Sequence, residues 1–400
     1  MLGPMADPAR EHDLVLFGAT GFTGALTAEH LARHAPADTR WALAGRNRAK
    51  LEALRERLGQ LEPRWAQLPL LHADVGDRAS LDALARSTRV VITTVGPYVT
   101  YGEPLVAACA AAGTDYCDLT GEFEFVDRMY VAHHAQAVQT GARLLHCCGF
   151  DSVPHDLGTQ FTVQQLPEGV PLEVRGFVRA KGMISGGTFH SAVTGMGRPR
   201  QNIAAARARQ AVEPPPPAGR RVKGLRTRPY REPVIDAWAI PLPTIDPQVV
   251  LRSAAAQERY GPDFRYAHHA WVKHLATAAG AGVGLTGVFL AAQLPPTRKL
   301  LLKAIAQGDG PSESRRASSW FTVRFLGVGG GRRVITEVTG GDPGYTETAK
   351  MLAQTGLSLA FDDVPPTAGQ VTTAAALGDA LRERLMAQGI GFNVIEESAA

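Results

Sequence analysis

The sequence predicts an α/β protein whose first part is a parallel sheet covered on both faces by helices. Between residues 13 and 148, short apolar runs rich in β-forming residues alternate with stretches in which apolar residues have helical spacing. A glycine-rich turn joins the first apolar run to the first helical stretch. From about residue 158 the pattern changes to strands with alternating faces. Together these observations favour a Rossmann-type domain followed by a second region of different construction.

The first strand, residues 13–17, is followed by three glycines at three-residue intervals and then by a helix that runs to residue 34. Gly18 permits a tight turn, Gly21 lets the backbone approach a pyrophosphate, and Gly24 allows the helix to pack close to the strand. An ordinary turn between strand and helix is the alternative, but the flanking elements favour dinucleotide binding. The residues expected to bind the dinucleotide here are Gly18, Thr20, Gly21, Phe22, Thr23 and Gly24.

The second strand, residues 41–45, ends in Arg46 and Asn47. Sites that prefer NAD usually carry an acidic residue here for the ribose 2′-OH, whereas this chain has no carboxylate before Glu52. A guanidinium pairs well with a 2′-phosphate. We therefore expect NADP(H), with Arg46 and Asn47 at its adenosine end. The alternative is that Arg46 is a solvated residue of a surface loop.

A helix over residues 49–61 and a third strand over residues 70–75 are expected next. The strand ends in Asp74 and Val75, and an acidic residue followed by an apolar one at this position commonly lies beside the adenine. We expect both residues to contact the cofactor. The alternative is that Asp74 caps the helix that starts near Ser80.

The fourth strand, residues 90–98, contains a Gly-Pro pair that stops it and bends the chain. Ligands of open α/β sheets lie beyond the carboxyl ends of the strands. The residues expected to border the nicotinamide are therefore Thr94, Gly96 and Pro97. A helix over residues 103–113, a strand over 116–119, a helix over 124–141 and a strand over 143–148 complete the domain.

Tyr98, Glu122 and Asp151 each follow a strand end of this sheet. Because parallel units carry all such ends to one edge, we expect the three side chains to line one pocket with the nicotinamide. Tyr98 is the expected proton donor, since a phenol there can donate to a substrate. The alternative is that Glu122 and Asp151 cap helices and that Tyr98 merely packs on the cofactor.

Several blocks carry a resemblance to a known family. They are Gly18-Ala-Thr-Gly-Phe-Thr-Gly24, Ala44-Gly45-Arg46, Val95-Gly96-Pro97-Tyr98, Asp118-Leu-Thr-Gly-Glu122 and Cys148-Gly-Phe-Asp-Ser-Val-Pro154, with Gly341-Asp-Pro-Gly-Tyr345 and Ala374-Ala-Ala-Leu-Gly-Asp-Ala-Leu381 nearer the C-terminus. The chain resembles the saccharopine dehydrogenase-like oxidoreductases, and within them the trans-acting enoyl reductases of actinobacterial lipid biosynthesis. The resemblance implies a nucleotide-binding domain, an inserted α+β domain, a C-terminal return to the first domain, and NADP-linked reduction of a lipid-type substrate.

The inserted part begins with a strand near residues 172–179 and a helix over residues 191–209. The segment from Arg198 to Arg231 holds ten basic residues, and Glu213 is its only acid. One interpretation is a solvated, partly disordered loop. The other is a docking patch for an anionic membrane surface or an acidic acyl carrier protein.

Residues 275–294 contain no charged side chain but are rich in alanine, glycine and threonine. A buried helical hairpin or a lipid-facing lid fits this composition better than a membrane span. Residues 320–326 and 332–339 are expected to pair as antiparallel strands, and residues 345–355 and 370–388 to form helices that return to the first domain. The expected domains are 1–157, 158–343 and 344–400.

The composition limits which partners, which cellular compartment and which metals are expected. The net charge of +4 disfavours nucleic acid, and so does the basic run, which lacks a series of interleaved aromatic residues and has Tyr230 as its only one. The four cysteines lack C-x-x-C spacing, and no secretory signal is expected at the start. Both observations favour a cytoplasmic protein. Peripheral contact with the inner face of the plasma membrane is expected through residues 198–231 and 275–294. The twelve histidines show no ligand spacing, so no metal is expected, and His133-His134 and His268-His269 are interpreted as surface pairs.

These observations lead to an NADP(H)-dependent oxidoreductase that reduces an enoyl or keto group of an acyl or polyketide-type intermediate. The expected partner is an acyl carrier protein or a polyketide synthase. A homodimer is a further expectation. An amino-acid dehydrogenase of the saccharopine type is one alternative. It needs clustered basic residues to bind two carboxylates, and apart from Lys181 the inserted domain offers few such candidates outside the basic run. A non-catalytic NADP-binding, membrane-associated protein is the other.

Overall fold

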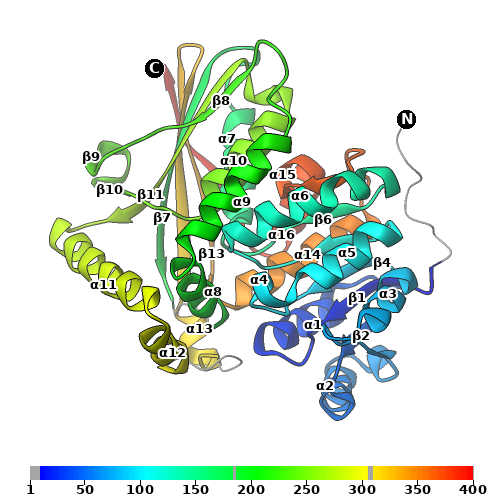
Figure 1. The fold of residues 1–400 in the computed structure, drawn as a ribbon. Coiled ribbons are helices and arrows are strands. Elements are labelled where there is room, and N and C mark those ends of the chain that lie inside the picture. Colours follow the sequence, from blue (N-terminus) through cyan, green and yellow to red (C-terminus); the bar gives the residue numbers. More distant parts are fainter. Residues whose placement is uncertain (1–9, 183–185, 305–309, 400) are drawn as a thin grey trace.

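Two sheets organise the chain in the computed structural model, which describes residues 10–182, 186–304 and 310–399 (Figure 1). The first sheet has seven parallel strands in the order β14-β6-β5-β4-β1-β2-β3. The second has eight strands of mixed direction, in the order β15-β13-β12-β7-β11-β10-β9, with β8 beside β11. The predicted Rossmann-type sheet and second α+β unit are thus confirmed. Residues 1–9, where no secretory signal was expected, lie outside the described residues.

Strands and helices alternate through the first sheet, as the sequence predicts. The elements are β1 (His12–Phe17), α1 (Phe22–His34), β2 (Trp41–Gly45), α2 (Arg48–Leu61), η1 (Pro63–Trp65), β3 (Leu70–His72), α3 (Arg78–Ser87), β4 (Thr88–Thr93), α4 (Tyr98–Tyr101), α5 (Glu103–Ala112), β5 (Asp115–Cys117), α6 (Phe123–Thr140), β6 (Arg143–Leu145) and α7 (Val153–Gln164). All residues of β1 and β2 are buried, because helices cover both faces of a parallel sheet. The strands at 70–75, 90–98 and 143–148 end earlier than predicted, since the backbone leaves the sheet at Ala73, Thr94 and His146.

The second sheet is built mainly from residues 172–340. Its elements are β7 (Leu172–Lys181), α8 (Gly186–Met196), α9 (Pro199–Val212), β8 (Arg221–Gly224), β9 (Tyr230–Glu232), η2 (Pro233–Ile235), β10 (Ala237–Pro241), α10 (Asp246–Ala256), η3 (Glu258–Tyr260), β11 (Asp263–Val272), α11 (Leu275–Gln293), α12 (Pro295–Ala304), α13 (Glu313–Ala317), β12 (Trp320–Gly329) and β13 (Arg332–Gly340). The predicted antiparallel pair is confirmed, with Phe321 opposite Gly340. Gly330 and Gly331 form its turn at φ of 57° and 74°, a conformation that favours glycine.

The chain beyond residue 344 contributes to both sheets. It forms α14 (Thr346–Phe361), β14 (Gly369–Val371), α15 (Thr373–Ala376), α16 (Gly378–Ala387) and β15 (Gly391–Ala399). α14 packs on α1 and β4, and β14 extends the first sheet beside β6. β15, however, pairs with β13 of the second sheet. The prediction of helices alone over this segment is therefore wrong at the two strands.

Much of the basic run is ordered secondary structure, so its interpretation as a partly disordered loop is wrong. The predicted helix 191–209 is two helices, α8 and α9, separated at Gly197 and Arg198. Arg198 binds the Glu124 carboxylate of α6 through Nε and Nη2, each at 2.7 Å. Strands β8 and β9 then join the second sheet. Some basic residues of the run, such as Arg198, therefore stabilise the fold.

The uncharged segment 275–294 is one helix, α11, and the expectation of a buried hairpin is wrong. Figure 1 shows α11 and α12 at the lower left, at the margin of the second unit. Leu290 and Leu294 are about three-fifths exposed, at 61% and 60%. Within the described parts of the chain, no helix combines the length and apolarity needed to cross a membrane.

The largest apolar core is continuous between the two sheets. Leu14 and Ile92 of the first sheet belong to the same buried cluster as Phe325 of the second. Helix α7 makes the link, because it starts beyond β6 and then lies against β7, β12 and β13. The carboxyl end of the first sheet is therefore adjacent to the second unit.

Candidate active site

The glycine turn between β1 and α1 has the shape that a phosphate group requires. Gly18 adopts a φ of +83°, and a Cβ at Gly24 would lie 2.2 Å from the Gly18 carbonyl oxygen. At Gly21, by contrast, a Cβ would have one neighbour, at 3.5 Å. Gly21 caps α1 without a side-chain hydrogen bond, and Thr20 and Gly21 are exposed. The first N–H groups of this 13-residue helix are thus available to an anion.

The end of β4 braces this turn. The Thr94 hydroxyl donates to the Gly18 carbonyl at 3.0 Å, and the Thr94 N–H donates to the Phe17 carbonyl at 3.1 Å. Phe22 and Thr23 are half-buried in the first turn of α1. Gly96 and Pro97 come shortly after Thr94, and the peptide bond between them is cis. The turn and the β4 end are therefore one unit at the edge of the sheet.

Arg46 is exposed directly after β2, and no ion pair to it occurs among the described residues. Asn47 accepts the Lys50 N–H at 3.0 Å and so caps α2. Arg48 differs from Arg46, because its Nε binds Glu52 Oε1 at 2.9 Å. An uncommitted guanidinium and an adjacent cap fit the 2′-phosphate end of a dinucleotide.

The residue that caps α3, the helix near Ser80, is Asp77 and not Asp74. The Asp77 carboxylate accepts the N–H groups of Ala79 at 3.1 Å and Ser80 at 3.3 Å. Asp74 instead accepts the Gly76 N–H at 2.9 Å, which shapes the turn after β3. Asp74 and Val75 are half-buried there.

Glu122 holds the start of α4. Its two carboxylate oxygens accept the N–H groups of Tyr98 at 3.0 Å and Val99 at 2.7 Å, and Oε1 also accepts the Ser191 hydroxyl at 2.6 Å. The alternative of a capping role is thus the one that the structure supports for Glu122. Its contact with Ser191 also joins the first sheet to α8.

Tyr98 is buried, and its hydroxyl is already engaged. The hydroxyl donates to the Thr93 carbonyl at 3.3 Å and accepts the Leu119 N–H at 3.2 Å. Burial, together with the charge of Asp118, raises the pKa of Tyr98 well above its usual value. The structure therefore does not support the expected role of Tyr98 as proton donor, because its proton is directed at a backbone oxygen. Tyr98 instead fixes the spacing between β4 and the loop after β5.

Asp151 is the member of the expected trio with an uncommitted carboxyl group. A Cβ at Gly121 would lie 3.2 Å from Asp151 Oδ2, so the segments after β5 and β6 meet at this edge. Within the described residues no hydrogen bond to the Asp151 carboxyl is present. Burial raises the pKa of Asp151 to about 6, so this group exchanges a proton near neutrality.

Comparison with known proteins decides the family. Residues 14–145 match the saccharopine dehydrogenase NADP binding domain. A protein of Mycobacterium tuberculosis, provisionally named a trans-acting enoyl reductase, is 40% identical over 97% of this chain and 98% of its own. A trans-acting enoyl reductase of Mycobacterium bovis is 36% identical over 96% of this chain and 98% of its own. The chain belongs to the trans-acting enoyl reductase family.

The fold agrees with this membership. Apo saccharopine dehydrogenase of Saccharomyces cerevisiae superimposes with a TM-score of 0.54 over 97% of this chain and all of that chain, at 12% identity, which shows the fold alone. The matched domain contains the glycine turn, Arg46 and the β4 end. This member of the trans-acting enoyl reductase family is thus an NADP(H)-dependent oxidoreductase.

Sequence reasoning missed the role of Asp118. Its Oδ1 accepts the N–H groups of Thr120 at 3.0 Å and Cys147 at 3.2 Å, while its Oδ2 accepts the Tyr116 hydroxyl at 2.9 Å and lies 2.6 Å from His146 Nδ1. Asp118 thereby shapes the loop that carries Glu122. An aspartate two residues before a threonine is a signal for such a local turn.

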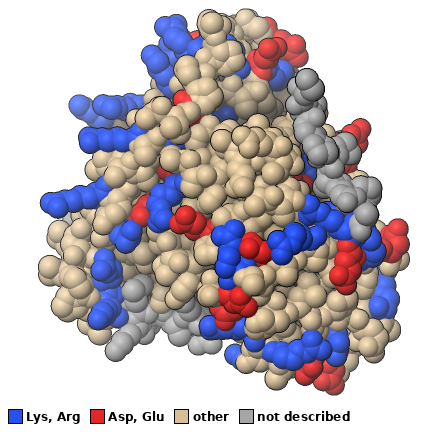
Figure 2. All heavy atoms as spheres, turned by 45° about the vertical axis from the view of Figure 1, so that its right-hand side comes forward, with Lys and Arg blue, Asp and Glu red and all other residues tan. Residues whose placement is uncertain are grey.

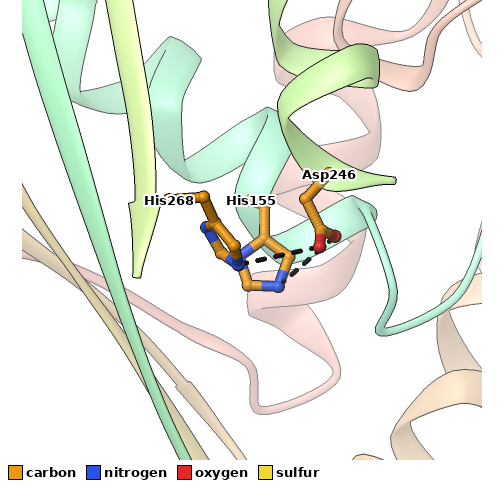
Figure 3. Close-up of side chains that lie close together, drawn as sticks. All are labelled: His155, Asp246 and His268. Atoms are coloured by element: carbon orange, nitrogen blue, oxygen red, sulfur yellow. Dashed lines mark ion pairs between the residues drawn. The ribbon is translucent and has the colours of Figure 1, made fainter. Parts of the chain in front are cut away.

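A second missed feature of this family member is a buried cluster of His155, Asp246 and His268 (Figure 3). These residues come from α7, α10 and β11, so no local spacing connects them. The interpretation of the histidine pairs as surface residues is wrong: His268 and His269 are buried, and His133 and His134 are half-buried. Burial lowers the pKa of His155 to about 3 and that of His268 well below its usual value.

Proposed function

We propose that this protein reduces the C=C bond of an enoyl thioester, or of a related polyketide-type lipid intermediate, with NADPH. The observation that carries the proposal is the nearly full-length similarity to proteins named trans-acting enoyl reductases. The site supports it, because an open phosphate turn and an uncommitted carboxyl group lie at the carboxyl ends of one parallel sheet.

The chain's residues have separate parts in this proposal. Thr20, Gly21, Phe22 and Thr23 bind the pyrophosphate at the start of α1, while Gly18 and Gly24 shape the turn. Arg46 and Asn47 bind the 2′-phosphate, and Asp74 and Val75 border the adenine. Thr94, Gly96 and Pro97 support the nicotinamide, and Tyr98 and Glu122 position this segment. The bound cofactor supplies a hydride.

Asp151 is the proposed proton donor. Reduction of an enoyl thioester adds a hydride to the β carbon and a proton to the α carbon. A carboxyl group with a pKa near the working pH suits the second step, because it is protonated in a useful fraction of molecules and is readily reprotonated from solvent. Desolvation of the carboxyl group raises its pKa, but Asp151 as a residue keeps part of its surface exposed to solvent, which leaves that route open.

An Asp151→Asn variant tests this role. Loss of a general acid lowers the rate by ~10²–10⁴, so kcat on an enoyl thioester is expected to fall by that factor while the Kd for NADPH is unchanged. In the wild type, kcat is expected to fall as pH rises above about 6, because Asp151 then loses its proton. This pH dependence should be absent from the residual activity of the variant.

Asp156→Asn is the matched control. Burial also raises the pKa of Asp156 to about 6, but its carboxylate accepts hydrogen bonds from Ser253, Thr373 and Ala374. This variant is expected to lose stability and to keep the pH profile. Undiminished kcat in Asp151→Asn rules out the donor role. NADP-linked oxidation of saccharopine without enoyl reduction rules out the proposed substrate instead.

We further infer that the partner is an anionic acyl carrier protein or its synthase, met in the cytoplasm. Basic side chains project along the left edge of Figure 2, where acidic ones are few. The exposed basic residues of the run that have no ion pair among the described residues are Arg200, Arg207, Lys223, Arg226 and Arg228. All four cysteines are buried free thiols, as suits a reducing compartment.

Binding to an acyl carrier protein is expected to weaken steeply as salt rises from 0.05 to 0.5 M (on the order of tenfold or more), because exposed charges are screened. A triple Arg226→Ser, Lys223→Ser, Arg228→Ser variant should bind more weakly, and Arg48→Ser, on the other unit, should not. Retained affinity in the triple variant contradicts the docking proposal. Stronger binding to anionic vesicles than to carrier protein assigns the patch to peripheral membrane contact.

A homodimer stays a prediction.

A further inference from the structure

Three side chains from distant parts of the chain meet between the two sheets. His155 lies in the first turn of α7, Asp246 begins α10, and His268 lies on β11. They are 2%, 3% and 5% exposed. Figure 3 shows both imidazole rings directed toward the Asp246 carboxylate. None of the three is used in the proposed reaction.

The distances within this cluster are too long for hydrogen bonds. His155 Nε2 lies 3.6 Å from Asp246 Oδ1, and His268 Nε2 lies 3.6 Å from Asp246 Oδ2, whereas N–H···O bonds span about 2.7–3.2 Å. Two ligands held tetrahedrally at about 2.0–2.1 Å from one ion are about 3.4 Å apart. The candidate ligand atoms all lie within 4.8 Å of one another. The separations thus suit three ligands around one centre.

The cluster also leaves buried polar atoms unsatisfied. His268 Nε2 and Asp246 Oδ1 have no hydrogen-bond partner among the described residues. Leaving such atoms unpaired in an interior is unfavourable, by about 1–3 kcal/mol for each. A cation bound between the rings and the carboxylate satisfies both atoms at once.

Polar neighbours orient two of the three ligands, His268 and Asp246, whereas His155 Nδ1 has no hydrogen-bond partner among the described residues. The Tyr266 hydroxyl lies 3.2 Å from His268 Nδ1, so this nitrogen can donate its proton to the phenol while Nε2 presents a lone pair to the centre. The Thr244 hydroxyl donates to Asp246 Oδ2. The His155 ring stands edge-on to the His268 ring, with centroids 4.6 Å apart. Metal sites are commonly supported by outer contacts of this kind.

We propose that His155, Asp246 and His268 form a binding site for one divalent cation of the zinc class. Two imidazoles and one carboxylate are a donor set of Zn²⁺ sites that keep a fourth position for water or another oxygen ligand. The ion would tie α7, which follows the first sheet, to α10 and β11 of the second unit.

The test is a Zn²⁺ titration of the full chain after treatment with chelator. We expect close to one Zn²⁺ per chain by mass spectrometry, a higher Tm with Zn²⁺ than without, and visible absorbance of a four-coordinate site when Co²⁺ replaces Zn²⁺. His155→Gln and Asp246→Asn, checked for folding by circular dichroism, are expected to weaken Zn²⁺ binding by about 100-fold or more. Tyr266→Phe, which keeps all three ligands, should weaken it by about 10–100-fold.

His269→Gln is the matched control. His269 is also buried and is next to His268 on β11, but it stacks on Phe177 on the other face of the strand. This variant should bind Zn²⁺ as the wild type does. The proposal is overturned if the wild type binds no Zn²⁺, or if the ligand variants bind it as tightly as His269→Gln. These readouts do not depend on enoyl reduction, so they stand apart from the proposed function.

Discussion

Arg46 and Arg48 lie two residues apart after β2, and their surroundings give them different roles. Arg46 is exposed with no ion pair among the described residues, whereas Arg48 binds Glu52 and the Leu70 carbonyl. A residue whose charge is not used by the fold is the better candidate for binding the 2′-phosphate.

Arg46→Ser is therefore expected to weaken NADPH binding by about 10–100-fold, the equivalent of ~1.5–3 kcal/mol for charge-assisted bonds. NADH binding should be nearly unchanged. Isothermal titration with both cofactors measures this difference, and Arg48→Ser is the control that should keep the preference. Equal dissociation constants for NADH and NADPH in the wild type contradict the role of Arg46.

Tyr98 and Asp151 illustrate what a residue's position leaves undecided. The sequence placed both after strand ends, and both segments do lie at the edge of the first sheet. Only the contacts separate them: the Tyr98 hydroxyl bonds to two backbone groups, and the Asp151 carboxyl has no such partner among the described residues. A side chain's hydrogen bonds depend on neighbours that local sequence does not specify.

At the scale of elements, two of the three glycines in the β1–α1 turn, Gly21 and Gly24, are glycine for different physical reasons. Gly24 is required by packing, since a Cβ there would lie 2.2 Å from a backbone oxygen. Gly21 has room for a Cβ and faces the exposed side of the turn. The fold needs one glycine and the ligand needs the other.

This difference predicts opposite outcomes for two alanine substitutions. Gly24→Ala is expected to destabilise the protein by several kcal/mol, because backbone must move. Gly21→Ala should change the Tm little yet weaken NADPH binding by tenfold or more, since its methyl group occupies the phosphate's approach. Thermal unfolding and cofactor titration of both variants measure this. A Gly21→Ala protein with normal affinity for NADPH excludes the turn as the phosphate site.

At the scale of the whole molecule, buried charges join the two units. Arg209 of α9 is 2% exposed, lies over the Tyr130 ring, and pairs with Glu213 and with Asp127 of α6. Asp127 also accepts hydrogen bonds from Gln248 and Arg252 of α10. One carboxylate of the first unit thus anchors two helices of the second.

Asp127→Asn is expected to lower the free energy of unfolding by about 3 kcal/mol, because removing one partner leaves buried guanidinium charge poorly compensated. The control is Glu103→Gln, which breaks the exposed pair with Arg128 and should change stability by less than ~1 kcal/mol. Urea unfolding of both variants makes the comparison. Equal losses would show that the buried network does not hold the units together.

The sequence by itself determined the local features. The strand, glycine turn and helix at residues 12–34, and the hairpin at residues 320–340, are specified by short-range patterns and by backbone conformations that favour glycine, such as those of Gly18 and Gly330. The resemblance to the saccharopine dehydrogenase-like oxidoreductases rests on such local blocks, which is why the NADP(H)-binding domain was predictable.

The tertiary structure alone decided how distant groups combine. It directed the Tyr98 hydroxyl to backbone, gave Glu122 to the start of α4, and sent residues 391–399 to the second sheet. It also brought together His155, Asp246 and His268 from two helices and a strand. Such pairings follow from packing of whole elements around a common core, and no local periodicity encodes which distant side chains will meet.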